Sequence, residues 1–219
     1  MRRMSKHLER DLAGLKKKLL GIGDLVEGAT RKALEALSER RLDLAQEVIA
    51  GDELVDEREV HFEEECLKVL ALNAPVAADL RMVIAFLKAN NDLERIGDLA
   101  KNIAQRAEFL ATQQDVEIPP RIRELGRRVR SMLSDALDCV VNTDVDKARL
   151  VIEQDEEVDR LHGEFYAVTQ ERLVAYPDRT EEIIQVLSVS RYLERIADQA
   201  TNIAEDVVFM VEGEVIRHQ

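Results

Sequence analysis

The sequence is poor in the residues that build β-rich folds. Its 219 residues include four prolines, nine glycines and no tryptophan, and aromatic residues make up only 4%. So few turn-forming residues leave little room for the many short strands of an all-β protein. Leu, Ala, Val, Ile, Glu, Arg and Asp dominate instead, a composition typical of long packed helices. With 46% hydrophobic residues, disorder is not indicated, and we expect an all-α fold with a sizeable core.

Cysteines are few and hydrophobic runs are short. Cys66 and Cys139 lie inside helical patterns at positions that do not correspond, which indicates neither a disulfide framework nor a CxxC metal site. We expect both in the core.

No apolar run approaches the roughly 18 residues of a membrane span, and the start, MRRMSKHLERDL, has no hydrophobic segment that could serve as a signal. We therefore expect a cytoplasmic protein that does not insert into membranes.

Basic residues are outnumbered, with 31 Lys and Arg against 44 Asp and Glu and a formal charge of −13. This balance argues against binding to nucleic acids or anionic membranes, because both need a basic footprint. It favours cations and basic surfaces as partners. One local exception is a basic run consisting of Arg121, Arg123, Arg127, Arg128 and Arg130. The simpler interpretation of this run is a solvated helix face in which Glu124 pairs with Arg127 or Arg128.

The most informative feature present is an internal repeat. LERIGDLAKNIA, residues 93–104, returns as LERIADQATNIA, residues 193–204, with nine of the twelve positions identical. AQEVIAGDELVD from Ala45 matches ARLVIEQDEEVD from Ala148 at an offset of 103, and Pro75 matches Pro177 at 102. Since each repeat reads as three helices with short antiparallel connections, we expect six helices as two tandem, repeat-related three-helix bundles, residues 1–114 and 115–219.

Apolar spacing and helix-breaking residues locate the six helices. Leu, Ile, Val and Ala recur at alternating steps of four and three from Leu8 to Ala33, which predicts a first helix over about 8–38. We expect a second over 43–72 with Asp43 as its cap, a third from Pro75 or just after it to about 112, and a linker at QQDVEIPP. The fourth then spans about 120–141, the fifth ends near 175, and the sixth follows Pro177 to about 212. Glycines within the first helix suggest close approach of another helix: Gly14, Gly21, Gly23 and Gly28.

Carboxylates occupy corresponding places in both repeats. Glu94 and Asp98 lie four residues apart, as do Glu194 and Asp198, with Asn102 and Asn202 one turn further. Residues at this spacing share a helix face, and like charges there repel each other. Around Pro75, Asp52 and Asp56 lie as far before the turn as Glu94 and Asp98 lie after it, which places all four at about 30 Å from the turn. Around Pro177, Asp155, Asp159, Glu194 and Asp198 line up in the same way.

A bound cation is the simplest remedy for the repulsion within each group of four acids. Carboxylates alone favour magnesium, calcium, manganese or iron, with zinc less expected from ligand type. The alternative is a layer of salt bridges, using the nearby basic residues Arg58, Arg95, Lys101 and Arg195.

Nothing in the sequence indicates a catalytic centre. A di-iron enzyme of the four-helix type needs Glu-x-x-His pairs, but Gly97 and Ala197 stand three residues after Glu94 and Glu194. His61 and His162 have no counterparts in the other repeat, and the other two histidines are near the ends. There is no phosphate-cradling glycine loop and no nucleophile elbow. We expect no enzyme.

The same residues carry a family resemblance. The doubled LERI[GA]D with its trailing Asn, together with PxAxDLR at residues 75–81, resembles the PhoU family, the phosphate-transport accessory proteins of bacteria and archaea. The similarity covers nearly the whole chain. It implies two three-helix bundles whose E(D)xxxD motifs bind multinuclear iron or zinc clusters. By position the ligands would be Glu94, Asp98, Glu194 and Asp198, with Asp52, Asp56, Asp155 and Asp159 facing them. The second repeat departs from the pattern after Pro177, reading DRTEEI where the first has VAADLR.

The resemblance implies a metal-dependent adaptor that represses the phosphate-starvation response and links the phosphate ABC transporter, through its ATPase, to a sensor histidine kinase. We also expect a homodimer. A carboxylate-bridged metal enzyme and a metal-free helical scaffold are the alternatives.

The first helix of each repeat has different charges beside the acids. Level with the four acids of the first repeat, this helix has Asp24 and Glu27, but the second repeat has Arg127 and Arg130 at the equivalent positions. We therefore expect the first group of acids to be the stronger metal site. We expect Arg81, Arg127 and Arg128 to help dock an acidic partner surface.

Overall fold

Six long helices, packed side by side, form the protein. The computed structural model describes residues 6–113, 117–214 and 216. Its helices are α1 (Lys6–Glu39), α2 (Leu42–Asn73), α3 (Ala78–Thr112), α4 (Pro120–Asn142), α5 (Val145–Ala175) and α6 (Thr180–Glu212), with a 3₁₀ turn η1 (Pro177–Arg179) before α6. No strand occurs in these ranges. The all-α prediction is confirmed, while the predicted boundary at 114/115 and part of the predicted linker lie outside the described residues.

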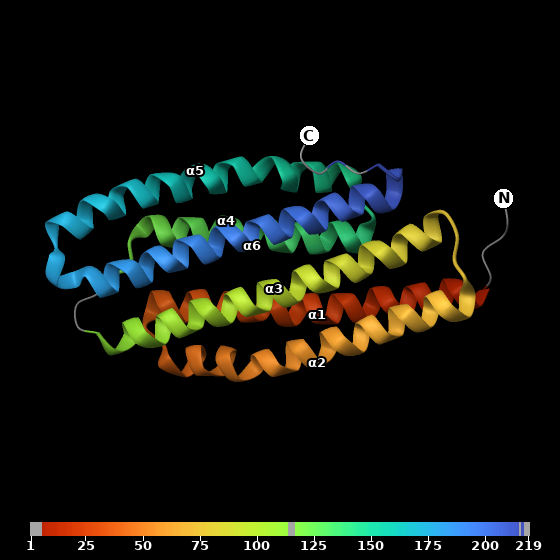
Figure 1. Cartoon of the computed structure of the whole chain (residues 1–219), viewed down its shortest axis with the longest axis horizontal. Coiled ribbons are helices and arrows are strands. Elements are labelled where there is room, and N and C mark those ends of the chain that lie inside the picture. Colours follow the sequence, from red (N-terminus) through yellow and green to blue (C-terminus); the bar gives the residue numbers. More distant parts are fainter. Residues whose placement is uncertain (1–5, 114–116, 215, 217–219) are drawn as a thin grey trace.

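The helices form two three-helix bundles joined along their length (Figure 1). α3 packs against α1, α2 and α6, and α6 packs against α3, α4 and α5. The two helices that carry the repeated motif therefore lie together at the centre, while α2 and α5 lie on opposite outer edges. The buried side chains of both bundles belong to one continuous core. Over the described helices, none is long and apolar enough to cross a membrane.

Much of the repeated motif is core packing. The apolar letters that the two copies share are fully buried in both: Leu93, Ile96, Ala100, Ile103 and Ala104, and Leu193, Ile196, Ala200, Ile203 and Ala204. They recur at helical spacing, so one face of α3 and of α6 faces the core. The shared polar letters lie on the remaining surface, exposed or half-buried. The predicted seam of α1 is likewise buried, except that Ala29 is half-buried.

The starts of α2 and α3 depend on backbone geometry that the sequence did not show. Arg41, not Asp43, occupies the N-cap of α2, and it has no side-chain cap. Asp43 lies in the first turn instead, where it accepts hydrogen bonds from Arg41 Nε at 2.8 Å and Nη2 at 2.6 Å. α3 starts at Ala78, just after Pro75, because Ala74 and Ala77 adopt positive φ angles of 43° and 51° that interrupt the helix.

Only one of the four glycines predicted to allow close helix approach does so. A Cβ at Gly23 would lie 2.6 Å from Leu137 of α4, whereas Gly14, Gly21 and Gly28 have nothing within 4 Å. The reciprocal contact is present as well, since a Cβ at Gly126 would lie 2.9 Å from Leu34. Gly126 and Leu137 stand 103 residues after Gly23 and Leu34, so each repeat inserts the same leucine against the same glycine of the other. This exchange indicates an approximate two-fold relation between the repeats at the seam of α1 and α4.

Both cysteines are core residues, as predicted. Cys66 and Cys139 are fully buried and free. Burial raises the pKa of the Cys66 thiol to about 12 and that of Cys139 to about 11. Thiols with such raised pKa values are poor nucleophiles and poor metal ligands at neutral pH.

Candidate metal centres

The structure brings the four predicted acids of the first repeat into one group, the first acidic cluster: Asp52 and Asp56 of α2 and Glu94 and Asp98 of α3. The pKa of Asp56 is raised by desolvation and then by the charges of Asp52 and Asp98. The pKa of Glu94 is raised by partial burial and then by Asp98 and Asp56. Mutual repulsion between these carboxylates therefore exists in the folded protein, as the spacing predicted.

A lysine lies inside this first cluster. Lys101 Nζ donates a hydrogen bond to Asp52 Oδ2 and forms an ion pair with it; Asp52 is 6% exposed. The hydrogen bond from Lys101 to Asp52 raises the pKa of Lys101, and the charges of Asp52, Asp98 and Asp56 raise it further. Of the basic residues considered for a salt-bridge layer, Lys101 is the one that the structure places on a cluster acid. The first acidic cluster thus contains a positively charged group of the chain itself, the ammonium of Lys101.

The second acidic cluster consists of Asp155 and Asp159 of α5 and Glu194 and Asp198 of α6. Burial, followed by the charges of Asp198 and Asp159, raises the pKa of Asp155 to about 6, against the opposing effect of the Thr201 hydroxyl. Burial and then the charge of Asp198 raise the pKa of Glu194. Burial and then Asp159 raise that of Asp198. These four carboxylates thus also lie close enough for their charges to act on one another.

The two clusters differ at one position of the repeat. Thr201 stands where the first repeat has Lys101. The Thr201 hydroxyl is close enough to Asp155 to lower its pKa, but Asp155 Oδ1 and Thr201 Oγ1 are both buried and no hydrogen bond of normal geometry joins them. A buried carboxylate oxygen without a donor is costly unless a cation or a proton satisfies it. The second cluster therefore fits a bound cation better than the first cluster, where the ammonium group of Lys101 already pairs with Asp52.

Each cluster is extended by one further polar pair that the sequence reasoning missed. In the first repeat Asn90 Nδ2 donates to Glu59 Oε1 at 3.1 Å. In the second, His162 Nδ1 shares a hydrogen bond of 2.7 Å with Ser190 Oγ. His162 stands 103 residues after Glu59 and Ser190 stands 100 after Asn90, so these pairs are equivalent although their chemistry differs. The repeat offset was the signal that could have found them.

Open space adjoins both clusters. A cavity of about 470 Å³ is lined by His162, Glu194, Arg195 and Asp198. Another of about 370 Å³ beside the first cluster contains Asp24 and Asp52. Within residues 6–113, 117–214 and 216, however, no group of three or more His, Cys, Asp or Glu side chains is already arranged to hold a metal ion. Coordination would require the carboxylates of a cluster to rotate toward a shared point.

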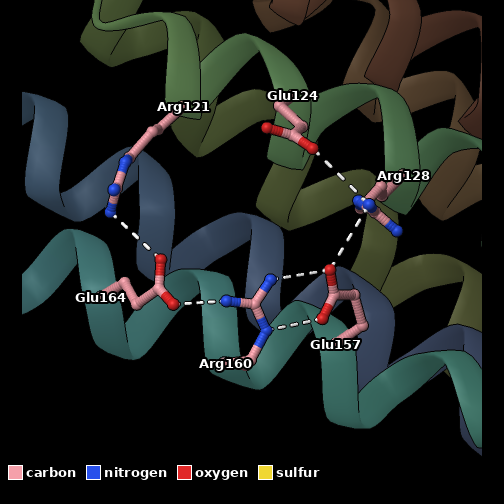
Figure 2. A network of polar contacts seen from close by, with 6 residues as sticks. All are labelled: Arg121, Glu124, Arg128, Glu157, Arg160 and Glu164. Carbon is pink, nitrogen blue, oxygen red and sulfur yellow. Dashed lines mark hydrogen bonds and ion pairs between the residues drawn. The ribbon is translucent and has the colours of Figure 1, made fainter.

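The arginines of α4 divide between two faces. Arg121 pairs with Glu164 of α5 at 3.2 Å, and Arg128 pairs with Glu124 at 3.5 Å and with Glu157 at 3.4 Å. Arg160 joins the two α5 glutamates, which completes the network in Figure 2. The expected partner of Glu124 is thus Arg128. Arg127 and Arg130 line a groove between α1 and α4, and neither is among the charges that shift the pKa of Asp155, so the predicted repulsion of cations by these two residues stays a prediction.

Arg81 belongs to neither face. Its Nε donates to the carbonyl of Met210 at 3.4 Å, and its guanidinium lies against Gly213 at the end of α6. Pro177 marks the turn between α5 and α6. Met210, the partner of Arg81, lies 33 residues after Pro177, and Glu157, the partner of Arg128, lies 20 residues before Pro177. The two places are therefore separated by about 20 Å along the bundle. Arg81 and Arg128 therefore do not form one compact basic patch.

Comparison with known proteins adds the family to this geometry. The PhoU domain matches twice, over residues 19–107 and 122–207, one match in each repeat. The chain belongs to the PhoU family. The phosphate-specific transport system accessory protein PhoU homolog of Pseudomonas putida is 37% identical over 98% of this chain and 84% of that protein. The homolog of the same description from Aquifex aeolicus is 36% identical over 97% of this chain and 96% of its own length.

Solved PhoU structures share the fold. PhoU from Pseudomonas aeruginosa superimposes with a TM-score of 0.90 at 34% identity, covering 94% of this chain and 99% of that one. The phosphate transport system regulatory protein PhoU from Streptococcus pneumoniae gives 0.85 at 30% identity, covering 95% and 99%. Two repeat-related three-helix bundles are thus the architecture of this PhoU family member, as predicted.

Proposed function

We propose that this chain is a cytoplasmic, metal-binding regulator of phosphate uptake. Its relatives are accessory proteins of phosphate-specific transport systems, and one matching structure is that of a phosphate transport system regulatory protein. The observation that carries the proposal is the pair of acidic clusters, because each is built on one copy of the motif that identifies the family. The full-length similarity supports the role as a transport accessory protein, and the two acidic clusters support the proposed metal binding.

The regulatory role would be to repress the phosphate-starvation response when phosphate is plentiful. The chain would do so by linking the ATPase of the phosphate ABC transporter to a sensor histidine kinase. Among the arginines expected to dock such partners, Arg128 and Arg81 are engaged in contacts within the chain. Arg127 is exposed and has no ion pair within the described part of the chain, so it is the best placed of the three.

The two clusters would bind metal with different strength. Asp155, Asp159, Glu194 and Asp198 would hold the more tightly bound ions, and Asp52, Asp56, Glu94 and Asp98 the weaker ones. This order reverses our expectation from Asp24 and Glu27, because Lys101 neutralises part of the first cluster. The family resemblance favours multinuclear iron or zinc. Such ions would neutralise the carboxylates and offer open coordination positions to a partner group.

A metal-free helical scaffold is the second candidate, and one observation favours it. The network of Figure 2 and the Lys101–Asp52 pair show that this fold satisfies several carboxylates with its own basic residues. If the second cluster did the same by protonation, no metal would be needed. Metal analysis of the purified full-length chain separates the two candidates.

The regulatory role is tested in bacteria that lack their own PhoU-family protein and carry a reporter of the phosphate-starvation response. We expect the chain to restore repression in phosphate-rich medium and Asp98→Asn/Asp198→Asn to restore much less. Glu153→Gln/Glu156→Gln on the exposed surface of α5 removes the same charge and serves as the control. Failure of the parent chain to repress would refute the regulatory role. Equal repression by the cluster variant would refute its dependence on metal.

A further inference from the structure

The groove between α1 and α4 is a second candidate binding site, distinct from the acidic clusters. It has a volume of about 330 Å³ and lies on the seam where the two repeats meet. Its charged lining consists of Arg31, Arg123, Arg127 and Arg130 with Glu35 and Glu39. Four guanidinium groups around one groove are unexpected in a chain with a formal charge of −13. Arginine clusters of this kind suit anions.

Helix geometry separates the groove arginines from those of Figure 2. Arg123, Arg127 and Arg130 follow one another at steps of four and three, so they share the face of α4 that borders α1. Arg121 and Arg128 lie on the face that borders α5, where glutamates neutralise them. The basic run of the sequence is therefore two surfaces, one of which is already paired.

The groove arginines of α4 lack partners of their own. No hydrogen bond or ion pair joins Arg123, Arg127 or Arg130 to another residue described in the structure, and Arg130 Nε is buried without an acceptor. Arg31 pairs with Glu35 at 3.6 Å, which uses one of the two glutamates. Guanidinium groups therefore exceed carboxylates in the groove, and a buried donor faces no acceptor.

We propose that this groove binds a small multivalent oxyanion, a phosphoryl or polycarboxylate compound. Guanidinium forks pair with phosphate and carboxylate oxygens through two parallel hydrogen bonds, and several forks around one groove require more than one negative charge. The volume lies at the lower end of the range for small-ligand pockets, too small for a folded partner. An occupant would contact α1 and α4 together and so tie the two repeats across the exchanged Gly23–Leu137 and Gly126–Leu34 contacts.

The test is calorimetric titration of the full-length chain after removal of metals, so that no anion can bind through a cation in the acidic clusters. Pyrophosphate and citrate represent the phosphoryl and polycarboxylate classes, and acetate at equal ionic strength is the monovalent control. We expect pyrophosphate or citrate to bind and acetate not to bind. The stronger of the two identifies the class of ligand.

Paired variants assign the binding to the groove. Arg127→Gln/Arg130→Gln should weaken the affinity at least tenfold, because charge-assisted hydrogen bonds are lost. Arg121→Gln/Arg128→Gln removes the same charge from the other face of the same helix and should leave the affinity within about twofold. If the first double variant does not fold, the exposed single changes Arg123→Gln and Arg127→Gln give the same readout. Absence of binding to the parent, or equal losses in both double variants, would overturn the proposal.

Discussion

The ammonium group of Lys101 donates a hydrogen bond to the carboxylate of Asp52. At the equivalent place of the second repeat, the hydroxyl of Thr201 lies beside Asp155. The two motif copies are identical at nine of twelve positions, and this is one of the three at which they differ. In place of the lysine that pairs with Asp52, the second cluster has a hydroxyl that makes no hydrogen bond of normal geometry with the buried Oδ1 of Asp155. We therefore expect the two clusters to differ in affinity for external cations.

Exchanging the two residues should exchange the behaviour of the clusters. Lys101→Thr, measured in an Asp198→Asn background that disables the second cluster, should tighten zinc binding by the first cluster at least about tenfold, because the competing ammonium is gone. Thr201→Lys in an Asp98→Asn background should weaken zinc binding by the second cluster to a similar degree. Competition titration with a zinc-sensitive dye measures both affinities.

The control for this exchange is Lys68→Thr, which removes an exposed lysine whose partner is the half-buried Glu65, outside both clusters. Zinc affinity should be unchanged there. If Lys101→Thr also leaves zinc affinity unchanged while the second cluster binds zinc in the parent, Lys101 does not compete with metal.

Removing the charge of Asp155 should stabilise the metal-free protein at neutral pH. Its pKa is raised in the folded state from 3.8 to about 6, so the folded state binds the proton more tightly than the unfolded state. The stability that this proton provides is fully present below about pH 4 and is lost as the pH rises through 6. Because the side chain is partly exposed, solvent screening reduces the cost of its charge at pH 7.5 to about 1 kcal/mol.

We therefore expect Asp155→Asn to raise the denaturant midpoint at pH 7.5 and to lose this advantage as the pH falls from 6 to 4. Urea unfolding at a series of pH values, with a chelator present, measures the difference. Glu153→Gln, an exposed position on the same helix, should show no comparable pH dependence. A destabilised Asp155→Asn protein at pH 7.5 would contradict the electrostatic interpretation.

His162 should influence which metal the second cluster prefers. It lines the same cavity as Glu194 and Asp198, and burial lowers its pKa, which favours the neutral imidazole that binds metals. Imidazole suits zinc and iron, whereas magnesium prefers oxygen ligands. His162→Gln should therefore weaken zinc binding several-fold and leave magnesium binding nearly unchanged. His61→Gln, at an exposed position of α2, is the matched control; equal effects of both changes on zinc would argue against a role for His162.

The glycines of α1 should respond differently to alanine. Gly21 has open space around its Cβ position, so Gly21→Ala should stabilise the protein by about 0.5–1 kcal/mol through the lower entropy of the unfolded chain. At Gly23 the same change meets Leu137 at 2.6 Å and forces it to move, so Gly23→Ala should gain less or lose stability. Chemical unfolding compares the two. Equal stabilisation would show that the α1–α4 seam is loosely packed.

Much of the architecture was predictable from the spacing of apolar residues, from the prolines and from the internal repeat. The helix ends follow from Pro75, Pro120 and Pro177 to within a few residues, and counting along the chain places the four acids of each repeat together. These features depend on local geometry, since a helix advances by a constant rise and a short turn fixes which residues are level.

Other features depend on how the two repeats pack, which periodicity does not specify. Gly21 and Gly23 look alike in sequence, but only Gly23 meets a helix of the other repeat. Arg81 contacts the end of α6, and Arg127 and Arg128 separate onto different faces of α4. The partner of Asp52 is Lys101, and not Arg58 or Arg95. Each of these outcomes requires three-dimensional packing.

The most direct test of the account is the metal content of the full-length chain and of two variants, each disabling one cluster. After identical loading with zinc or iron and removal of excess metal, elemental mass spectrometry measures ions per chain in the parent, Asp98→Asn and Asp198→Asn proteins. We predict that the parent retains metal, that Asp198→Asn loses more of it than Asp98→Asn, and that all three remain folded. A parent chain without metal, or two variants that retain the full content of the parent, would contradict the assignment of these clusters as metal sites.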